Sequence, residues 1–237
     1  MKVLNVVLGI VGVIALYMLY RYFFVDNREK TLVSYKDAKV QQSISSGNLP
    51  SGASINFTYS LWFYVNDWNY KYGEEKVIFE HLTSDNEPVP LVYFDKTTNN
   101  LNVTLSTFKT DNDGTTSGDA TQSTCYIENV PLQKWTNLIV TLNGRALDLY
   151  LDGKLVRTCV LPGVPKTSDN NILVTPNGGY SGYISYFRYL SYAVNPTQAY
   201  NIYKEGYGGS SLGGLLDKYK VKIAFLEDNK EVNSFEI

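Results

Sequence analysis

Two closely spaced turn dipeptides constrain the fold of this 237-residue chain more than any other feature. From Trp135 to Val156 the sequence reads WTNLIVTLNGRALDLYLDGKLV, with Asn-Gly at residues 143–144 and Asp-Gly at residues 152–153. Such dipeptides are typical of two-residue type I′ turns, because both central residues need a positive φ there. The sequence therefore predicts three short antiparallel strands joined by two tight hairpins.

The register of these hairpins predicts which face of the strands lies in a core. Leu149 is expected opposite Leu138 on one side and Val156 on the other. Val140 is expected opposite Leu147. The predicted core face consists of seven apolar residues: Leu138, Val140, Leu142, Leu147, Leu149, Leu151 and Val156.

The opposite face of the same strands is polar. Asp148 and Arg157 are expected directly across from each other, as an ion pair that contributes at most about 1 kcal/mol if it is exposed. Tyr150 and Thr141 share this face. We predict that it meets either water or a partner, so Asp148, Tyr150 and Arg157 are candidate partner-binding residues.

The composition is that of an ordinary folded protein, with 44% apolar and 19% charged residues. A formal net charge of −2 argues against nucleic-acid binding, which requires a basic surface. Twenty tyrosines and 18 glycines favour strands and turns over helices.

The amino terminus carries a long apolar segment. Between Lys2 and Arg21 the sequence VLNVVLGIVGVIALYMLY is interrupted only by Asn5, and as a helix it is long enough to cross about 30 Å of hydrocarbon. A cleaved signal peptide would have a shorter apolar region that ends in small residues, whereas this segment ends in LYRYFFVD. Residues 1–25 are therefore predicted to be a transmembrane anchor in a lipid bilayer.

The flanking charges predict the orientation of this anchor. Lys2 and the terminal amine precede it, whereas five basic residues follow it: Arg21, Arg28, Lys30, Lys36 and Lys39. By the positive-inside rule, we predict a single-pass membrane protein whose large domain faces the cytosol. Residues 26–50 mix charge with Ser and Gly and are interpreted as a tether, although TLVSY at residues 31–35 is also typical of a first strand.

From residue 55 onward the pattern is typical of strands. INFTYSLWFYV at residues 55–65 places Trp62 and Tyr64 on one face and the alternate residues on the other. Further strand-like segments follow at short spacing, without the strand–helix alternation of a parallel sheet. The sequence therefore predicts an all-β domain over residues 51–208, folded as a two-sheet antiparallel jelly-roll sandwich.

One short surface helix is expected near the end of this domain. In AVNPTQAYNIYKEG, Asn195 can cap the helix, Pro196 suits its first position, and Gln198 completes a capping box. Together with the N-terminal transmembrane helix, it completes the predicted set of helices.

The sequence shows no pattern of catalytic residues. His81 is the single histidine and lies in IFEHLTS, where a histidine at a strand end is more often structural. The acidic residues between Glu74 and Glu87 lack the E-x-D-x-E alternation by which a retaining glucanase pairs its two acids. We predict that the protein is not an enzyme and needs no cofactor.

A weak calcium site is the one metal candidate. In TDNDGTTSGDA, Asp111, Asp113 and Asp119 could supply oxygen ligands, but the bidentate acid of an EF-hand loop is missing. A polar loop without metal is the preferred interpretation.

Cys125 and Cys159 flank the two hairpins on strands that are expected to be neighbours. They either form a disulfide or remain two buried thiols in a reducing compartment. The sequence leaves both alternatives open.

Residues 209–237 are predicted to form a Gly-rich linker and a C-terminal hairpin. Apolar residues alternate with lysines in DKYKVKIAF, and an Asp-Asn pair follows at residues 228–229. The hairpin either completes the jelly roll, which is the preferred prediction, or adds to the sheet edge of a neighbouring subunit.

Three motifs, taken in order, resemble a known family. FTYSLWFYV (residues 57–65), LQKWTNLIVTLNGRALDLYLDGKLVRT (132–158) and GYSGYISYFRYLSYAVNPTQAYNIYKEG (179–206) are similar to laminin G-like, concanavalin A-like jelly-roll domains. The resemblance covers residues 51–208. It implies the sandwich fold and, since some relatives bind calcium, the weak metal site.

The anchor, jelly roll and closing helix together also resemble virion membrane proteins of large DNA viruses that infect algae and amoebae. This resemblance implies a non-enzymatic minor capsid protein between the inner membrane and the outer shell of the virion, with capsid or other virion proteins as partners. It brings no functional residues. Because such viruses carry thiol oxidases, it also implies that the cysteine pair can be oxidised on the cytosolic side.

A membrane-tethered lectin or adhesin is the alternative function. Trp68, Tyr70 and Tyr72 in NDWNYKYGEE are aromatic side chains that could stack on sugar rings. This alternative predicts a glycan partner and a domain that lies outside the cell or virion.

Overall fold

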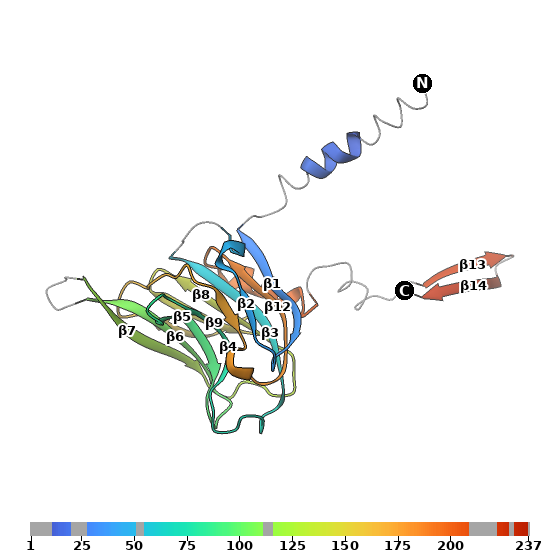
Figure 1. Cartoon of the computed structure of the whole chain (residues 1–237). Helices are drawn as coiled ribbons and strands as arrows, with labels where there is room; N and C mark the ends of the chain where they lie inside the picture. The colour runs from blue at the N-terminus through green and yellow to red at the C-terminus, as the bar shows by residue number, and fades with distance from the viewer. Residues whose placement is uncertain are drawn as a thin grey trace.

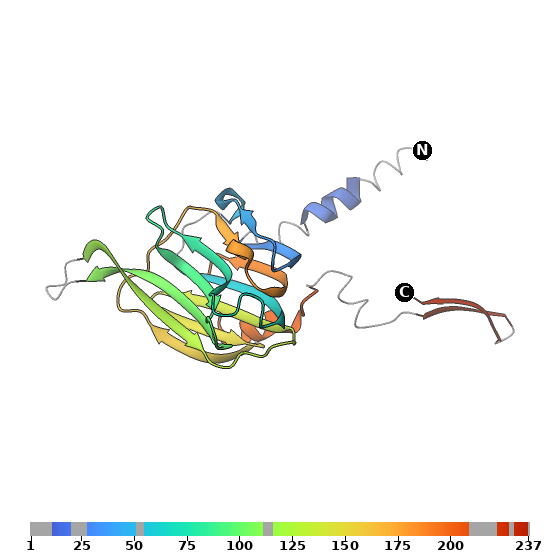
Figure 2. The same ribbon diagram turned by 60° about the horizontal axis from the view of Figure 1, so that its bottom comes forward.

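The structure is a computed structural model that describes residues 11–19, 28–50, 55–110, 116–208, 222–227 and 230–236. Most of these residues form a sandwich of two six-stranded sheets (Figure 1). Figure 2 shows the same layers of strands after a 60° turn. The predicted all-β, two-sheet antiparallel sandwich is confirmed.

Neighbouring strands are antiparallel throughout both sheets. Sheet A has the strand order β1 (Glu29–Asp37), β12 (Ser181–Leu190), β3 (Phe57–Asp67), β8 (Thr136–Asn143), β9 (Ala146–Leu151) and β10 (Lys154–Val160). Sheet B has the order β2 (Gln42–Ile44), β11 (Ile172–Val174), β4 (Lys76–Leu82), β5 (Pro88–Phe94), β6 (Leu101–Thr110) and β7 (Thr116–Ile127). Two 3₁₀ turns, η1 (Ser46–Asn48) and η2 (Pro176–Gly178), lie in the connections.

Strand alternation builds the core between the sheets. On β3 the residues predicted to face inward are buried from Phe57 to Val65, whereas Ile55, before the strand, is 47% exposed. Ile78 and Phe79 of sheet B are fully buried in the same core. Each such side chain contributes about 1.5–3 kcal/mol when it leaves water, so facing apolar rows hold the layers together.

The Asn-Gly hairpin turns one residue later than predicted. Asn143 pairs with Ala146, so Gly144 and Arg145 are the turn residues. Gly144 has a φ of 59°, and neither Asn143 nor Arg145 has a positive φ. This pattern is typical of a type II′ turn, which takes glycine at its first central position. The predicted type I′ turn is therefore wrong here.

The later turn shifts the predicted pairs but keeps the predicted face. Val140 lies opposite Leu149, and Leu138 lies opposite Leu151. Because each partner moves by two residues, no side chain changes face. The residues of the predicted core face on β8 and β9 are fully buried, except that Leu151 is partly buried.

The Asp-Gly hairpin forms the predicted type I′ turn. Asp152 and Gly153 have φ values of 48° and 73°, and Lys154 pairs with Leu151 across the turn. The register then shifts between Leu155 and Arg157, so the residue between them, Val156, is not opposite Leu149 and is 45% exposed. A bulge in β10 therefore overturns the predicted place of Val156 in the core.

The predicted surface helix is confirmed as α2 (Pro196–Lys204). Its capping box is complete, because Asn195 and Gln198 each accept a backbone N–H of the other at 2.9 Å. The helix packs on the outer face of sheet A through a second apolar cluster: Ile139, Tyr150, Leu190, Val194, Ala199 and Ile202.

The segment before the sandwich differs from the predicted tether. Residues 29–37 and 42–44 are strands β1 and β2, so the alternative of a first strand at TLVSY is the one that the structure shows. The predicted anchor, residues 1–25, falls largely outside the described residues, of which 11–19 are helical. No helix in the described part of the chain is long and apolar enough to cross a membrane.

The C-terminal hairpin consists of β13 (Lys222–Glu227) and β14 (Lys230–Glu236). The two strands pair with each other in a separate two-stranded sheet and belong to neither sheet A nor sheet B. The preferred prediction, that this hairpin completes the jelly roll, is therefore wrong for the described residues.

A disulfide bond joins the edge strands of the two sheets. Cys125 lies on β7 and Cys159 on β10, with their Cα atoms 6.0 Å apart and a sequence separation of 34. Cys125 is 1% exposed and belongs to the main core. The bond thus links sheets A and B at the edge where no hydrogen-bonded strand joins them.

We predict that the Cys125→Ser/Cys159→Ser double variant loses about 3–4 kcal/mol of unfolding free energy, because a closed loop of this length restricts the unfolded chain. Denaturant titration of the oxidised and reduced protein measures this loss. The double variant is the control, since its midpoint should not respond to a reductant. A wild-type midpoint that is equally insensitive would contradict the prediction.

The Asp-Gly turn also packs against α2, whereas Gly144 of the Asn-Gly turn has no such contact. A Cβ atom at Gly153 would lie 2.8 Å from the Cβ of Tyr203, whereas a Cβ at Gly144 would meet nothing within 4 Å. Both glycines have positive φ, which costs other L-residues roughly 1–2 kcal/mol. Gly153 therefore serves both the turn and the helix contact.

Gly153→Ala should consequently lower the unfolding free energy more than Gly144→Ala does. The second variant reports the cost of positive φ alone, and the difference between the two reports the displacement of Tyr203. Paired denaturation curves measure both. Equal losses would show that α2 does not rest on the turn.

Candidate functional site

A row of aromatic side chains covers part of the outer face of sheet A. We call it the aromatic shelf, and its members are Tyr35, Tyr64, Trp135, Tyr183 and Tyr207. Tyr35, Tyr183 and Tyr207 are 59%, 39% and 49% exposed. Contiguous exposed apolar groups on a protein surface often mark binding sites.

Strand order brings these rings together. Tyr183 on β12 pairs with Asp37 of β1 on one side and with Tyr64 of β3 on the other. The rings of Tyr35 and Tyr183 stack, with centroids 5.5 Å apart and planes at 21° to each other. The ring centroids of Tyr64 and Trp135 are 5.6 Å apart. The shelf therefore spans β1, β12, β3 and Trp135, the residue before β8.

The segment after α2 completes the shelf at its far end. Tyr207 stacks on Trp135 with centroids 5.1 Å apart and planes 4° apart. The hydroxyl of Ser185 lies 2.5 Å from the carbonyl oxygen of Tyr207 and 2.9 Å from that of Ser34. Beneath it, Trp62 contacts the ring of Tyr207. These contacts hold Tyr207 in place although half of its side chain is open to solvent.

A small polar notch borders the shelf. It has a volume of about 80 Å³ and is lined by Asp37, Lys39, Asn66, Ser181, Gly182 and Tyr183. The Oδ1 atom of Asp37 accepts the backbone N–H of Lys39 at 2.8 Å, which fixes the carboxylate at the rim. Slight burial, together with the nearby Tyr183 and Asp37, raises the pKa of Tyr35, so its hydroxyl stays protonated and can donate.

This arrangement offers apolar ring faces beside hydrogen-bonding groups. Aromatic faces are suited to flat, partly apolar surfaces such as the C–H faces of sugar rings. The notch adds a carboxylate acceptor, an amide and a hydroxyl within the same small volume. The shelf and notch together are therefore the candidate functional site.

A second cavity lies between the two sheets. Its volume is about 280 Å³, and its lining includes Tyr59 of sheet A and His81 of sheet B. The Nε2 atom of His81 is 3.0 Å from the carbonyl oxygen of Asn170, and its Nδ1 atom is 3.0 Å from the hydroxyl of Tyr59. Since a carbonyl only accepts, Nε2 carries the proton and Tyr59 donates to Nδ1.

His81 is therefore an inter-sheet contact rather than an open base. Burial lowers its pKa, against smaller opposing effects of the Asn170 hydrogen bond and of Asp169. Burial also raises the pKa of Tyr59 well above its ordinary value. Both groups are neutral near pH 7, and both ring nitrogens of His81 are engaged.

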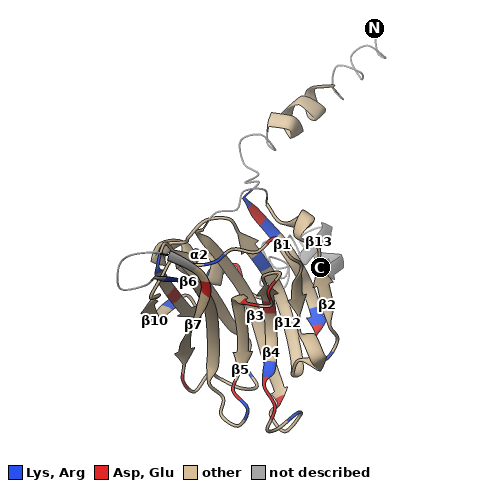
Figure 3. Cartoon of the chain, turned by 60° about the vertical axis from the view of Figure 1, so that its left-hand side comes forward, with Lys and Arg blue, Asp and Glu red and all other residues tan. Residues whose placement is uncertain are grey.

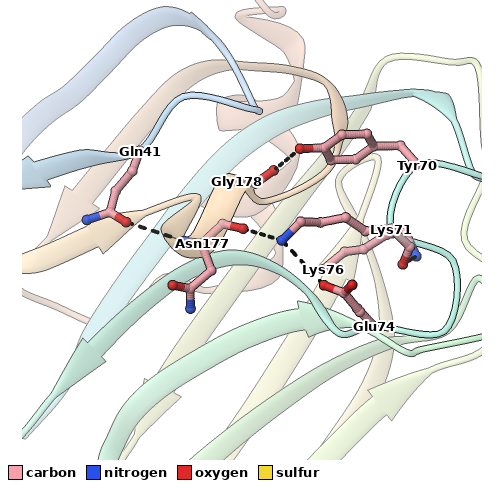
Figure 4. Close-up of polar contacts among 7 residues, drawn as sticks. All are labelled: Gln41, Tyr70, Lys71, Glu74, Lys76, Asn177 and Gly178. Carbon is pink, nitrogen blue, oxygen red and sulfur yellow. Dashed lines mark hydrogen bonds and ion pairs between the residues drawn. The ribbon is translucent and has the colours of Figure 1, made fainter.

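The predicted sugar-binding loop is held against its own domain (Figure 4). Tyr70 donates to the carbonyl of Gly178 at 3.2 Å, and Lys71 donates to the carbonyl of Asn177. Trp68 packs edge-on against Phe94 and is partly buried. Trp68 and Tyr70, two of the three aromatic residues predicted to stack on sugar, therefore already contact other parts of the protein.

Lysine and glutamine side chains complete this support. The Nζ atom of Lys76 donates to the carbonyl of Lys71 at 3.0 Å and lies 4.5 Å from the ring centre of Trp68. Gln41 accepts the backbone N–H of Asn177 at 3.3 Å (Figure 4). Of the three predicted aromatics, Tyr72 alone is widely open, with 61% exposure.

The predicted polar face on β9 and β10 is covered at Tyr150 but open at Arg157, which is exposed. Tyr150 is 1% exposed because α2 covers it. Asp148 pairs with Thr158, whose hydroxyl it accepts at 2.5 Å, and Arg157 stacks on the ring of Tyr126. The bulge in β10 thus removes the predicted pairing of Asp148 with Arg157.

The predicted calcium ligands are described only in part. Asp111 and Asp113 lie outside the described residues, and Asp119 is an exposed residue of β7. Among the residues described, no group of three or more His, Cys, Asp or Glu side chains could hold a metal ion. Figure 3 shows acidic and basic residues interspersed over the strands.

Sequence reasoning found only part of the aromatic shelf. Alternation on β3 correctly placed Tyr64 opposite the core face. Tyr35 lies in the segment predicted to be a tether or, as the alternative, a first strand. Local patterns carry no sign that Trp135, Tyr183 and Tyr207 lie near it. The density of tyrosines in YSGYISYFRY was the one available signal, but it did not indicate a neighbouring strand.

Solved structures with this fold include three binding domains of botulinum neurotoxins. The receptor-binding domain of neurotoxin D aligns with a TM-score of 0.54 and 13% identity, over 75% of this chain and 52% of that one. The binding domain of serotype G gives 0.50 and 15%, over 74% and 46%. The binding domain of neurotoxin DC in complex with SialylT gives 0.50 and 12%, over 75% and 46%.

The chain thus spans about half the length of these structures, and identities this low show the fold alone. No curated protein gives a significant match. Residues 37–199 match the family model described as the concanavalin A-like lectin/glucanases superfamily, which confirms the family resemblance of the three sequence motifs. Because this match covers more than half of the chain, the protein belongs to the concanavalin A-like lectin/glucanase superfamily.

Proposed function

We propose that the protein is a non-enzymatic glycan-binding module whose site is the aromatic shelf and its notch. The observation that carries the proposal is the row of exposed rings, from Tyr35 through Tyr183 to Tyr207, on the outer face of sheet A. Membership of a superfamily of lectins and glucanases supports it. The SialylT complex of a neurotoxin domain with this fold also supports it, although this chain covers 46% of that domain.

The two parts of the site have separate tasks. Stacked Tyr35 and Tyr183 present a flat apolar surface for the C–H face of a sugar ring. Asp37 and the protonated Tyr35 hydroxyl can accept from and donate to the hydroxyl groups of that sugar. Such a division gives affinity through area and selectivity through hydrogen bonds.

Binding without catalysis is proposed because glycoside hydrolysis needs two carboxyl groups that flank the scissile bond. The notch has one, that of Asp37. Glu87, which lies near the inter-sheet cavity, is paired with Lys166 at 2.7 Å. The lining of that cavity includes one carboxylate, that of Asp169, and does not include Glu87, so among the described residues neither place presents two facing carboxyl groups.

We expect the full chain to bind a glycan on an array of neutral and sialylated oligosaccharides. Tyr183→Ala should weaken the affinity for the best ligand at least tenfold, about 1.4 kcal/mol, because it removes the central ring of the shelf. Tyr72→Ala is the matched control, since it removes an exposed tyrosine of the other predicted site. Calorimetry measures the affinities, and thermal unfolding shows that both variants fold.

Three results would count against the shelf. The array could give no ligand, Tyr183→Ala could bind as tightly as the wild type, or Tyr72→Ala could show the loss instead. A loss of binding in Tyr72→Ala alone would place the glycan site at the loop that contains Trp68 and Tyr70. Asp37→Asn distinguishes stacking from hydrogen bonding, because it leaves every ring in place.

A second candidate function is a structural one, that of a membrane-anchored minor capsid protein that joins an inner virion membrane to the outer shell. The apolar sequence between Lys2 and Arg21 favours it. In this case the domain faces the cytosol, and its partners are the bilayer and other virion proteins. The same exposed rings would then contact a protein.

The side of the membrane on which the domain lies distinguishes the lectin proposal from the structural one. Under the structural proposal, the domain of the full chain expressed in eukaryotic cells should be cut by protease added to sealed microsomes. Under the lectin proposal, it should be protected and should carry glycans at Asn56 or Asn102, which lie in Asn-x-Thr sequences. Immunoblotting with and without glycosidase provides the measurement.

A further inference from the structure

The cavity between the two sheets differs in chemistry from the shelf. Phe57, Tyr59 and Tyr189 line it from sheet A. Tyr59 and Tyr189 are a cross-strand pair on β3 and β12 with ring centroids 5.1 Å apart, and Phe57 lies 5.3 Å from Tyr59. Three aromatic rings thus line one side of a half-open cavity of about 280 Å³.

The mouth of the cavity carries a carboxylate. Asp169 belongs to the connection between β10 and β11, is exposed, and lies opposite η1 with Ser46 and Gly47. Its negative charge is close enough to His81 to raise the pKa of that ring, against the larger lowering effect of burial. A ligand that enters between these segments therefore passes a negative charge before it reaches the rings.

The one lysine of the lining does not cancel this charge. The Nζ atom of Lys166 lies 2.7 Å from Glu87 Oε2 and donates to the carbonyl of Gly118 at 2.9 Å. Its charge is thus compensated by a residue outside the lining. His81 is neutral in this environment, so Asp169 is the uncompensated charge of the cavity.

Electron-rich ring faces and a nearby carboxylate are the elements of a site for an organic cation. We propose that the cavity bounded by Phe57, Tyr59, Tyr189 and Asp169 binds a small quaternary ammonium ion of the choline type. The methyl groups pack on the three rings and on Val89, and the charge faces Asp169. The hydroxyl of Tyr189, which has no hydrogen bond within the described residues, is available to the polar end of the ligand.

The volume fits this class of ligand. A trimethylammonium group with a short alcohol arm is compact enough for a cavity of about 280 Å³. The polar groups of Tyr59 and His81 are hydrogen-bonded to each other, so they do not bind the ligand. The cavity is therefore a receptor for a head group.

The test compares choline with 3,3-dimethylbutan-1-ol, its uncharged isostere, by calorimetry on the full chain. Choline should bind at least tenfold more tightly, because only the charged ligand gains from the rings and from Asp169. Acetate serves as the anionic probe and should not bind. Equal affinity of the two isosteres, tighter binding of acetate, or no binding of choline would each overturn the proposal.

Variants assign the binding to named groups. Asp169→Asn, an exposed change, should weaken choline at least tenfold and leave the uncharged isostere unaffected. Tyr189→Leu should lose choline binding, whereas Tyr189→Phe should retain the ring contribution. Thermal unfolding checks the tyrosine variants, and if Tyr189→Leu fails to fold, the Asp169→Asn comparison still decides the question. An Asp169→Asn variant that binds choline normally would contradict the assignment.

Free choline and a phosphatidylcholine head group share this chemistry. Water-soluble dibutyryl phosphatidylcholine distinguishes them, because tighter binding than choline indicates a lipid source and weaker binding indicates the free ion. The cavity shares no residue with the aromatic shelf. Tyr183→Ala should therefore leave choline binding intact, so failure of one proposal does not affect the other.

Discussion

The contact between the inner faces of the two sheets is the constraint on which the rest of the structure depends. Apolar side chains from alternate positions of both sheets fill this layer, and each gains about 1.5–3 kcal/mol by leaving water. The disulfide of Cys125 and Cys159 holds one edge of the layers, and the hydrogen bond of Tyr59 to His81 joins them at the cavity. Because the inner faces of the sheets form the core, ligands can bind only at the outer faces or between the sheets at their ends.

Sheet A uses its outer face in two ways. One part is covered by α2, so that Tyr150 and Ile139 lie in a second apolar cluster. The other part remains open, and there the rings of Tyr35, Tyr183 and Tyr207 meet solvent. The end of α2 marks the border between these parts, because the chain that leaves the helix places Tyr207 on Trp135. A single short helix therefore both closes the fold and delimits the proposed glycan site.

Much of the fold could be predicted from local patterns. The alternation on β3, the type I′ turn at Asp152-Gly153 and the capping box of Asn195 and Gln198 depend on residues close in sequence, so they could be recognised without tertiary information. Registers were less secure. The Asn-Gly hairpin turned one residue late, and the bulge at Val156 separated Asp148 from Arg157, because side-chain packing across strands decides such details.

The sequence by itself determined the strands from β3 onward, their inward-facing residues apart from Val156, and the helix cap, since periodicity and turn chemistry act over a few residues. Only the tertiary structure decided the sites. It placed β1 beside β12, which brought Tyr35 to Tyr183, and it folded α2 over Tyr150. It also set Asp169 at the mouth of a cavity lined by aromatic rings. These placements depend on strand order across long sequence separations, and no local preference encodes that order.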